Sequence, residues 1–163
     1  MMAQIGVPAA AVRAHGELFA YWASLRQGAR LPGRRDLDPG GMKRLLPTVS
    51  LIEVAREDPL DFRVRLAGTG LYGVYGREIT GRTLGDIYST AAADYWRGEL
   101  GKVIAQRRPT VGVHNLAWRG VSHLSILWLR LPLASNGRDV DMILGYDAIV
   151  GVRGEAMSGI RAA

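Results

Sequence analysis

The chain has 163 residues, of which 48% are hydrophobic and 22% charged, so it is long enough for one domain with a buried core and too apolar for wholesale disorder. Cysteine is absent, which excludes disulfides, thiolate metal sites, cysteine nucleophiles and covalent cofactor adducts through a thiol. The net charge of +6 comes from 21 basic and 15 acidic side chains that are interleaved along the sequence. Arg26, Arg30, Arg34 and Arg35 form a loose group and Arg107 and Arg108 a pair, so the charge pattern favours a solvated surface over a nucleic-acid partner.

The sequence contains no candidate membrane segment. Its apolar runs are far shorter than the roughly 20 residues that span a bilayer. The N-terminal stretch has no basic region ahead of its apolar residues, so it makes a poor signal peptide. We therefore predict a cytoplasmic location with no membrane partner.

Residues 8–27 have the spacing of an amphipathic helix. Pro8 suits the first helical position, where its missing N–H is not needed, and Gly28 suits a C-terminal cap. One apolar stripe runs along this segment: Ala14, Leu18, Tyr21, Trp22 and Leu25. A polar connection follows, and then a short helix that Asp38 caps and that Pro47 is expected to end.

From residue 48 onwards the hydrophobic period changes to that of strands. Residues 48–55 and 62–67 read as two strands, with Asp58 and Pro59 in the turn between them. The segment 68–89 holds six glycines, each of which costs about 1 kcal/mol inside a helix, so we expect short helical turns in a winding loop.

The second half continues with one helix and three strands. Residues 91–107 return to helical spacing, and strands are expected near 110–119, 121–134 and 140–150. Asn136-Gly137 is a strong hairpin turn signal. Because the strands follow one another as hairpins, the sequence predicts an antiparallel sheet and an α+β fold.

This order of elements, with its particular residues, resembles a PAS domain, and more narrowly a family of small bacterial proteins made of a single PAS domain. Segments 17–39 and 45–54 are similar to that family's opening helix and first strand, and 61–87 is the strongest match. Within it one set of residues follows the general PAS pattern: Gly76, Arg77, Glu78, Gly81, Arg82 and Asp86. The resemblance extends from about residue 17 to about residue 150.

The resemblance implies a five-stranded antiparallel sheet of order 2-1-5-4-3 flanked by helices, with the N-terminal helix as an addition. It divides the chain into an N-terminal helix and connection (1–40), a PAS core (41–150) and a C-terminal tail (151–163). PAS domains are sensor and interaction modules, many of which bind a small molecule between sheet and helices.

We therefore predict a non-enzymatic sensor or regulatory module that binds a small molecule or a protein partner. No output domain fits beside the PAS core in 163 residues, so a signal is expected to pass by contact with another, unknown protein. The alternative is a basic nucleic-acid-binding or scaffold protein that uses a PAS-like fold only structurally.

No cofactor or metal has a motif here. PAS domains that bind haem typically carry an axial histidine on the longer helix, and residues 91–107 contain none. A cysteinyl–flavin adduct is excluded, whereas a noncovalent flavin or another small ligand stays open. His15, His114 and His123 lack metal-ligand spacing, although His114 and His123 fall on neighbouring strands and could face each other.

We predict no catalytic residue. The glycines at 68, 70 and 73 fit a nucleotide-loop spacing, but no long helix follows them, so a tight crossover is the better interpretation. Asp139, Asp141 and Asp147 alternate near the last strand. A paired-carboxylate site would use such residues, but solvent-facing strand positions explain them more simply.

Five residues form the candidate ligand pocket. Tyr88, Tyr95 and Trp96 would contribute from the helical side, and Trp128 and Arg130 from a strand. Filling the core explains the aromatic residues about as well. Arg130 lies in an apolar strand, so if it is buried it needs an anionic partner, either in the protein or on a ligand.

The N-terminal helix also predicts an assembly. Its apolar stripe would cost several kcal/mol if left in water, at about 25 cal/mol per Å2. It can fold back on its own sheet or pack on a second copy. The PAS resemblance favours the second placement, so we predict a homodimer through this helix.

Overall fold

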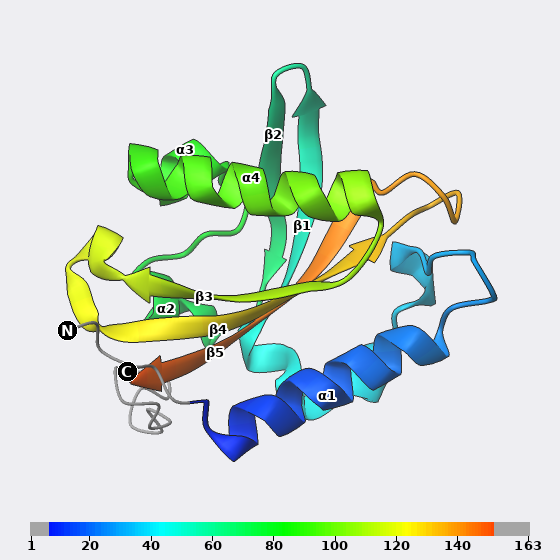
Figure 1. Ribbon diagram of the computed structural model, residues 1–163, viewed down its shortest axis with the longest axis horizontal. Helices are drawn as coiled ribbons and strands as arrows, with labels where there is room; N and C mark the ends of the chain where they lie inside the picture. Colours follow the sequence, from blue (N-terminus) through cyan, green and yellow to red (C-terminus); the bar gives the residue numbers. More distant parts are fainter. Residues whose placement is uncertain (1–6, 152–163) are drawn as a thin grey trace.

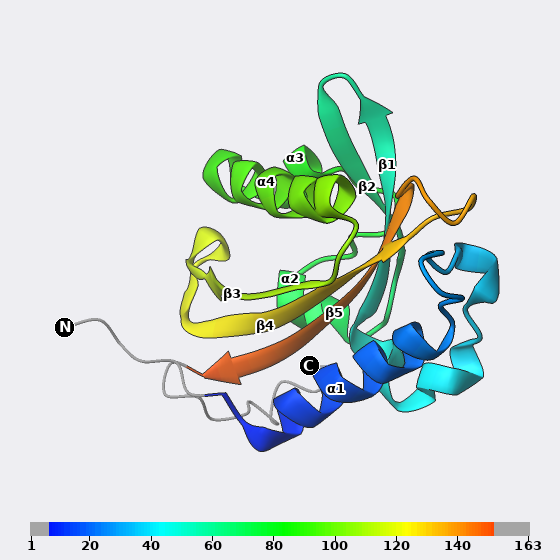
Figure 2. The same cartoon turned by 45° about the vertical axis from the view of Figure 1, so that its right-hand side comes forward.

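The computed structural model describes residues 7–151, which form one antiparallel sheet with helices on both faces (Figure 1). The strand order is β2-β1-β5-β4-β3, which confirms the predicted fold class and topology. Helix α4 lies over one face of the sheet, here called the inner face, and helix α1 lies along the opposite, outer face (Figures 1 and 2).

The five predicted strands are present: β1 Val49–Glu57, β2 Leu60–Ala67, β3 Thr110–Leu116, β4 Val121–Leu133 and β5 Met142–Gly151. Strand β5 is central, because it pairs with β1 on one side and with β4 on the other. The prediction for β3 was three residues too long. Its last residues form a 3-10 turn, Ala117–Arg119, because the Asn115 side chain accepts the Ala117 N–H and turns the backbone out of the sheet.

Helix α1 covers Ala9–Ser24 and ends earlier than predicted. Its last amides form 3-10 type bonds from Leu25 to Trp22 and from Arg26 to Ala23. Gly28 has a φ of 64°, but it lies in the turn after the helix and does not cap it. The Gly28 cap prediction was therefore wrong, because the helix tightens and stops before reaching it.

A three-residue 3-10 turn, Arg34–Asp36, follows α1, and after it comes a longer 3-10 helix, Pro39–Thr48. Asp38 caps it as predicted, accepting the Gly40 N–H at 3.0 Å. The prediction that Pro47 ends the helix was wrong, since the turns continue to Thr48. The fixed φ of proline is compatible with helical turns, and a helix this short loses little by the missing N–H.

The glycine-rich crossover holds two short helices, α2 Leu71–Tyr75 and α3 Leu84–Ile87, as the prediction of helical turns in a loop required. Helix α4, Thr90–Gln106, follows directly, and the Ser89 side chain caps it by accepting the Ala92 N–H. These three helices cover the inner face of the sheet. The buried face of α4 carries Trp96, Leu100 and Val103.

Helix α1 packs against the sheet of its own chain. Leu18 and Trp22 are fully buried, and the Trp22 indole N–H donates to the Pro132 carbonyl at 2.9 Å. His15 places Nε2 at 3.0 Å from the Leu127 carbonyl and packs edge-on against Tyr146. The stripe is thus covered without a second copy, which is the fold-back placement.

The homodimer through the N-terminal helix stays a prediction, although its original argument, the apolar stripe, is met by the fold-back placement. The stripe that motivated it is buried within the chain, whereas Val12 and Phe19, seven positions apart, remain exposed. The predicted C-terminal tail from residue 152 onwards lies outside the described residues. Within residues 7–151, no helix has both the length and the apolar character that a membrane span requires.

The packing of α1 predicts that shortening two side chains of this helix has very different effects on the free energy of unfolding. Leu18→Ala should lower the free energy of unfolding by about 2–5 kcal/mol, because Leu18 is 0% exposed and its loss leaves a cavity against the sheet. Val12→Ala, at a position 55% exposed, should change it by no more than about 0.5 kcal/mol. Urea unfolding of both variants measures this, and equal effects would contradict the fold-back packing of α1.

Candidate functional site

Arg130 lies at the centre of the inner face and is only 2% exposed. Its Nη1 donates to the Asp147 carboxylate at 2.8 Å and to the backbone carbonyls of Leu129 and Tyr146. Asp147 is 1% exposed and sits on the adjacent strand β5. The sequence analysis predicted an anionic partner for a buried Arg130, and that partner is a carboxylate of the protein itself.

The sheet register creates the space for this ion pair. Arg130 is paired directly with Gly145, so Asp147, two residues further along β5, is its diagonal neighbour on the same face. A Cβ at position 145 would lie 3.2 Å from Arg130 Nη1 and 2.5 Å from Ser50 Oγ. The absence of a side chain at Gly145 lets the guanidinium lie flat against the sheet.

Two tyrosines extend the ion pair into the helical layer. The Tyr75 hydroxyl, at the end of α2, donates to the second Asp147 oxygen at 2.8 Å. The Tyr88 hydroxyl, just after α3, donates to the Tyr75 hydroxyl at 3.3 Å. Burial, with Asp147 nearby, raises the pKa of both phenols well above the ordinary value, so both stay protonated and act as donors.

The charge on Arg130 is retained despite its burial. Desolvation opposes the charged form, but the nearby Asp147 carboxylate outweighs it, and the pKa of Arg130 is raised. The guanidinium carbon also lies 4.7 Å from the ring centroid of Trp96 and 5.7 Å from that of Trp128. These distances allow cation–π attraction in a dry environment.

A small cavity lies beside this network, between the sheet and the helices α2, α3 and α4. Its volume is about 20 Å3, which is room for roughly one water molecule. Its wall is mostly apolar. The lining residues are Ser50, Ile52, Val64, Tyr75, Ile79, Leu84, Ile87, Tyr88, Trp96, Leu100 and Arg130.

Hydrogen-bonding groups without a partner gather around this cavity. Six buried side-chain atoms in the described part of the chain make no hydrogen bond, and one of them, Arg26 Nε, lies elsewhere. Two of the others, Trp96 Nε1 and Arg130 Nε, belong to lining residues. The remaining three belong to residues that pair with or contact a lining residue: Thr110 Oγ1, His114 Nδ1 and Trp118 Nε1. Since buried polar atoms are normally satisfied, such a concentration in one place calls for an explanation.

The structure brings the five predicted pocket residues into one cluster but gives them different places. Tyr88, Trp96 and Arg130 line the cavity. Trp128 packs behind Trp96, with ring centroids 5.2 Å apart, and donates its indole N–H to the Tyr95 hydroxyl at 3.2 Å. That any of them contacts a ligand stays a prediction.

Three other predictions concerned carboxylates. Asp147 was expected to face solvent, which is wrong, because its strand position points inward to Arg130. Asp139 and Asp141 precede β5 in the β4–β5 connection, where they bond to Asn136 and Ser135. The signal that was overlooked for Asp147 is the one that singled out Arg130, a charge in an otherwise apolar strand.

Tyr75 and Ser50 were also missed. Tyr75 lies in the glycine-rich segment, where no regular period shows which side chains point inward. Ser50 precedes the apolar part of β1, and only the pairing of β1 with Gly145 places it next to Arg130. Neither residue had a sequence signal for a role in this site.

The histidines do not converge. His114 is paired with Ile126 and stacks on the Tyr95 ring at 4.3 Å, so it does not face His123. His15 contacts the outer face of the sheet. Residues 7–151 contain no group of three or more histidine or carboxylate side chains placed to hold a metal ion.

A flavin does not fit the inner site as it is built. The cavity has room for about one water, whereas a flavin carries a three-ring system. The remaining space between α4 and the sheet is filled by Trp96, Trp128 and Arg130, all nearly inaccessible to solvent.

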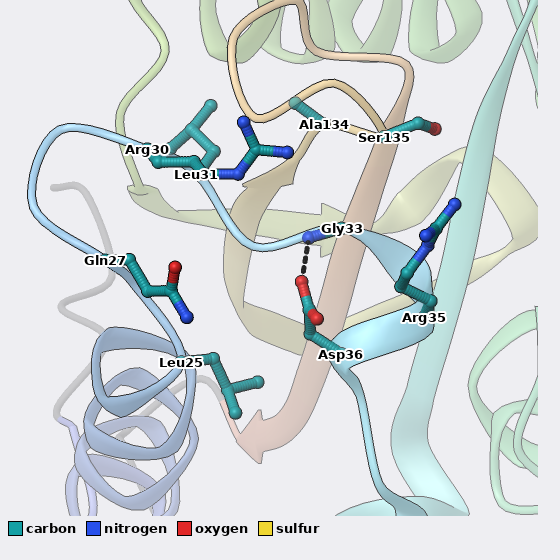
Figure 3. Close-up of a pocket in the computed structure, with 9 residues that line it drawn as sticks. All are labelled: Leu25, Gln27, Arg30, Leu31, Gly33, Arg35, Asp36, Ala134 and Ser135. Atoms are coloured by element: carbon teal, nitrogen blue, oxygen red, sulfur yellow. Dashed lines mark hydrogen bonds between the residues drawn. The ribbon is translucent and has the colours of Figure 1, made fainter.

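A second pocket lies on the surface, where the exit of α1 meets the β4–β5 connection (Figure 3). Its volume is about 110 Å3, and the side chains of Arg30 and Arg35 lie on either side of Gly33. Asp36 accepts the Gly33 N–H at 2.8 Å, and Arg30 donates to the Asn136 carbonyl at 3.0 Å. Arg30 and Asp36 thus already have hydrogen-bond partners within the protein.

Residues 10–147 match the family model of the PAS domain, and the chain belongs to that family. The family groups sensor domains. No curated protein matches the chain.

Solved structures that match this chain include light-oxygen-voltage proteins. A LOV protein of Rhodobacter sphaeroides is 13% identical, with a TM-score of 0.49 over 71% of this chain and 69% of its own. The d2 variant of RsLOV is also 13% identical, with a TM-score of 0.49 over 85% and 68%. An RNA-binding light-oxygen-voltage receptor is 16% identical, with a TM-score of 0.50 over 78% of this chain and 36% of that receptor, which shows a shared fold.

The buried ion pair predicts a strongly non-additive mutant cycle. Arg130→Met should lower the free energy of unfolding by about 3–5 kcal/mol, because it leaves the Asp147 carboxylate buried without a counter-charge. The double variant Arg130→Met/Asp147→Leu should recover the larger part of that loss. Urea unfolding measures all the variants, and a double variant no more stable than Arg130→Met would contradict the pairing.

The two half-buried histidines predict that stability falls in mild acid. Burial lowers the pKa of His15 and His114 from the ordinary value of 6.5, so between the lowered pKa values and 6.5 the unfolded chain binds more protons than the folded one. Unfolding free energy should therefore be constant between about pH 7 and about pH 9 and decrease below about pH 6.5. Urea midpoints at about pH 7.5 and about pH 5.5 test this.

The matched control is His15→Gln/His114→Gln, which should lose most of the difference between the two pH values. Glu78 and Asp86 have pKa values lowered by bonds to Thr80 and Thr83, so they titrate below this window. An unchanged difference in the double variant would assign the effect to other groups.

Proposed function

We propose that this PAS domain is a sensor module that binds a small molecule in the inner cavity and passes the signal to another protein by contact, without a catalytic step. The observation that carries the proposal is the Arg130–Asp147 ion pair, buried next to a cavity whose walls hold donors without partners. A buried ion pair is often no better for stability than apolar residues of the same volume. Its presence here therefore favours a functional role.

The network connects the elements that a sensor must move. Tyr75 ties α2 to Asp147, Tyr88 ties the end of α3 to Tyr75, and Trp96 brings α4 against Arg130. A molecule in the cavity would contact all of these residues except Asp147. A change in occupancy therefore acts on the helices and on strand β4 together.

The outer surface offers a route for the output. Asp147 faces the cavity side of β5, while its neighbour Tyr146 faces α1 and contacts His15. A shift of β5 at Asp147 would move Tyr146 with it, because both share one strand. Helix α1 exposes Val12 and Phe19 on its far side, and this is then the surface that a partner protein contacts.

The inner site does not favour catalysis. The raised pKa values of Tyr75 and Tyr88 keep both phenols protonated, and a protonated phenol is a poor base and nucleophile. Both oxygens of Asp147 already accept hydrogen bonds. These groups hold a structure together and leave none free to take a proton from a substrate.

Nucleic-acid binding is the less favoured alternative. In the described chain several basic side chains are neutralised locally, as in the pairs Arg97–Asp94, Lys102–Glu99 and Arg44–Glu17. Surface charge of mixed sign gives little counterion release on a polyphosphate. Titration with a nucleic acid at two salt concentrations should therefore show weak binding.

Native mass spectrometry of the purified protein tests the proposal. We expect a bound small molecule whose occupancy falls severalfold in Gly145→Ala, because the added methyl group pushes the Arg130 side chain towards the cavity. The matched control is Gly85→Ala in α3, where an added Cβ meets nothing within 4 Å. A protein that carries no small molecule, or equal occupancy in both variants, would contradict the ligand-sensing function.

A further inference from the structure

We propose that the ligand of the inner cavity is a small neutral molecule with a hydrogen-bond-accepting oxygen, such as a ketone, aldehyde or amide, and not an anion. The inference rests on the proposed sensor function and names the chemical class that the site selects. It is carried by the arrangement of donors and charge around Arg130.

The first argument is the set of unused donors. The hydrogen bonds from Arg130 to described residues all leave from Nη1, and Nε is buried without a partner. The indole N–H of Trp96, another lining residue, is also buried without a partner. Both atoms donate and neither accepts, so the missing group is an acceptor.

The second argument is charge. The Arg130 guanidinium is already neutralised by Asp147 at 2.8 Å. An anionic ligand would add a second negative charge to an enclosed, mostly apolar space, where an uncompensated charge is costly. A neutral acceptor satisfies Nε without disturbing the balance of the ion pair.

The third argument is size and shape. Hydrocarbon side chains from β1, β2, α4 and the crossover form most of the wall: Ile52, Val64, Ile79, Leu84, Ile87 and Leu100. The cavity of about 20 Å3 accepts little more than one polar atom without movement of its walls. A ligand with carbon atoms therefore needs the walls to move apart, so it is compact, with its oxygen towards Arg130 and its carbon atoms towards the apolar side chains.

A matched set of three probes tests this assignment. Acetone, acetate and isobutene share one trigonal skeleton but differ as neutral acceptor, anion and hydrocarbon. Titration of the 15N-labelled full chain would follow the Trp96 indole N–H and the Arg130 Nε–H resonances. We expect acetone to shift both resonances and to bind roughly tenfold or more tightly than either other probe, as expected for a hydrogen bond to a charged donor.

Two variants keep the fold and remove one donor each. Trp96→Phe keeps an aromatic ring over Arg130 but deletes the indole N–H, and Arg130→Lys keeps a positive charge for Asp147 but deletes Nε–H. Each should lose most of the preference for acetone over isobutene, whatever the change in isobutene binding itself. Retention of that preference in both variants would overturn the assignment of the donors.

The remaining outcomes separate the two proposals. Tighter binding of acetate would overturn the ligand class, but the sensor function would stand if native mass spectrometry shows a bound molecule. Equal binding of all three probes, or no shift with any of them, would also overturn the ligand class and would indicate a site for water alone. A chain that in addition carries no small molecule on purification would contradict the sensor function itself.

Discussion

The ion pair between Arg130 and Asp147 is the constraint around which the inner half of this protein is arranged. A guanidinium at 2% exposure must have a counter-charge close by, and the β4–β5 register provides it from the neighbouring strand. Gly145 leaves the space in which the guanidinium lies, and Trp96 covers it from the helical side. The second oxygen of Asp147 then orders Tyr75, so one charge determines contacts in both layers.

The glycine opposite Trp128 also leaves space for a large side chain. Gly112 on β3 is paired with Trp128, and a Cβ there would lie 2.4 Å from the indole ring. The indole therefore extends across the edge strand and reaches the Tyr95 hydroxyl. Two strand positions without side chains, at Gly112 and Gly145, allow two large side chains, Trp128 and Arg130, to fill the space between α4 and the sheet.

The fold could be predicted from the sequence because its signals are local. Alternation in β2, the helical stripe of α4 and the Asn136-Gly137 turn each depend on a few adjacent residues. The site could be predicted only in part. Arg130 stood out as a charge in an apolar strand, but its partner depends on the register between β4 and β5, which shows that Asp147, and not Asp139 or Asp141, faces inward.

Helix α1 shows a different limit of sequence reasoning. The apolar stripe with Leu18 and Trp22 predicts that this face of α1 is buried. The hydrophobic effect has no direction, however, so the stripe does not predict which surface covers it. The polar contacts decide it here, since the Trp22 indole N–H reaches Pro132 and His15 reaches Leu127 in the same chain. These partners lie more than one hundred residues away and leave no trace in the local pattern.

The two faces of the central strand explain how a buried site can have an effect outside. Successive residues of a strand point to opposite faces. Asp147 therefore bonds to Arg130 on the inner face, while Tyr146 packs against α1 on the outer face, with no intermediate element between them. The carbonyl of Tyr146 also accepts a hydrogen bond from Arg130. Any movement of the guanidinium would therefore change a backbone contact of the residue that supports α1. The link between the inner site and the outer helix is the peptide chain itself, and it needs no pathway of side chains across the sheet.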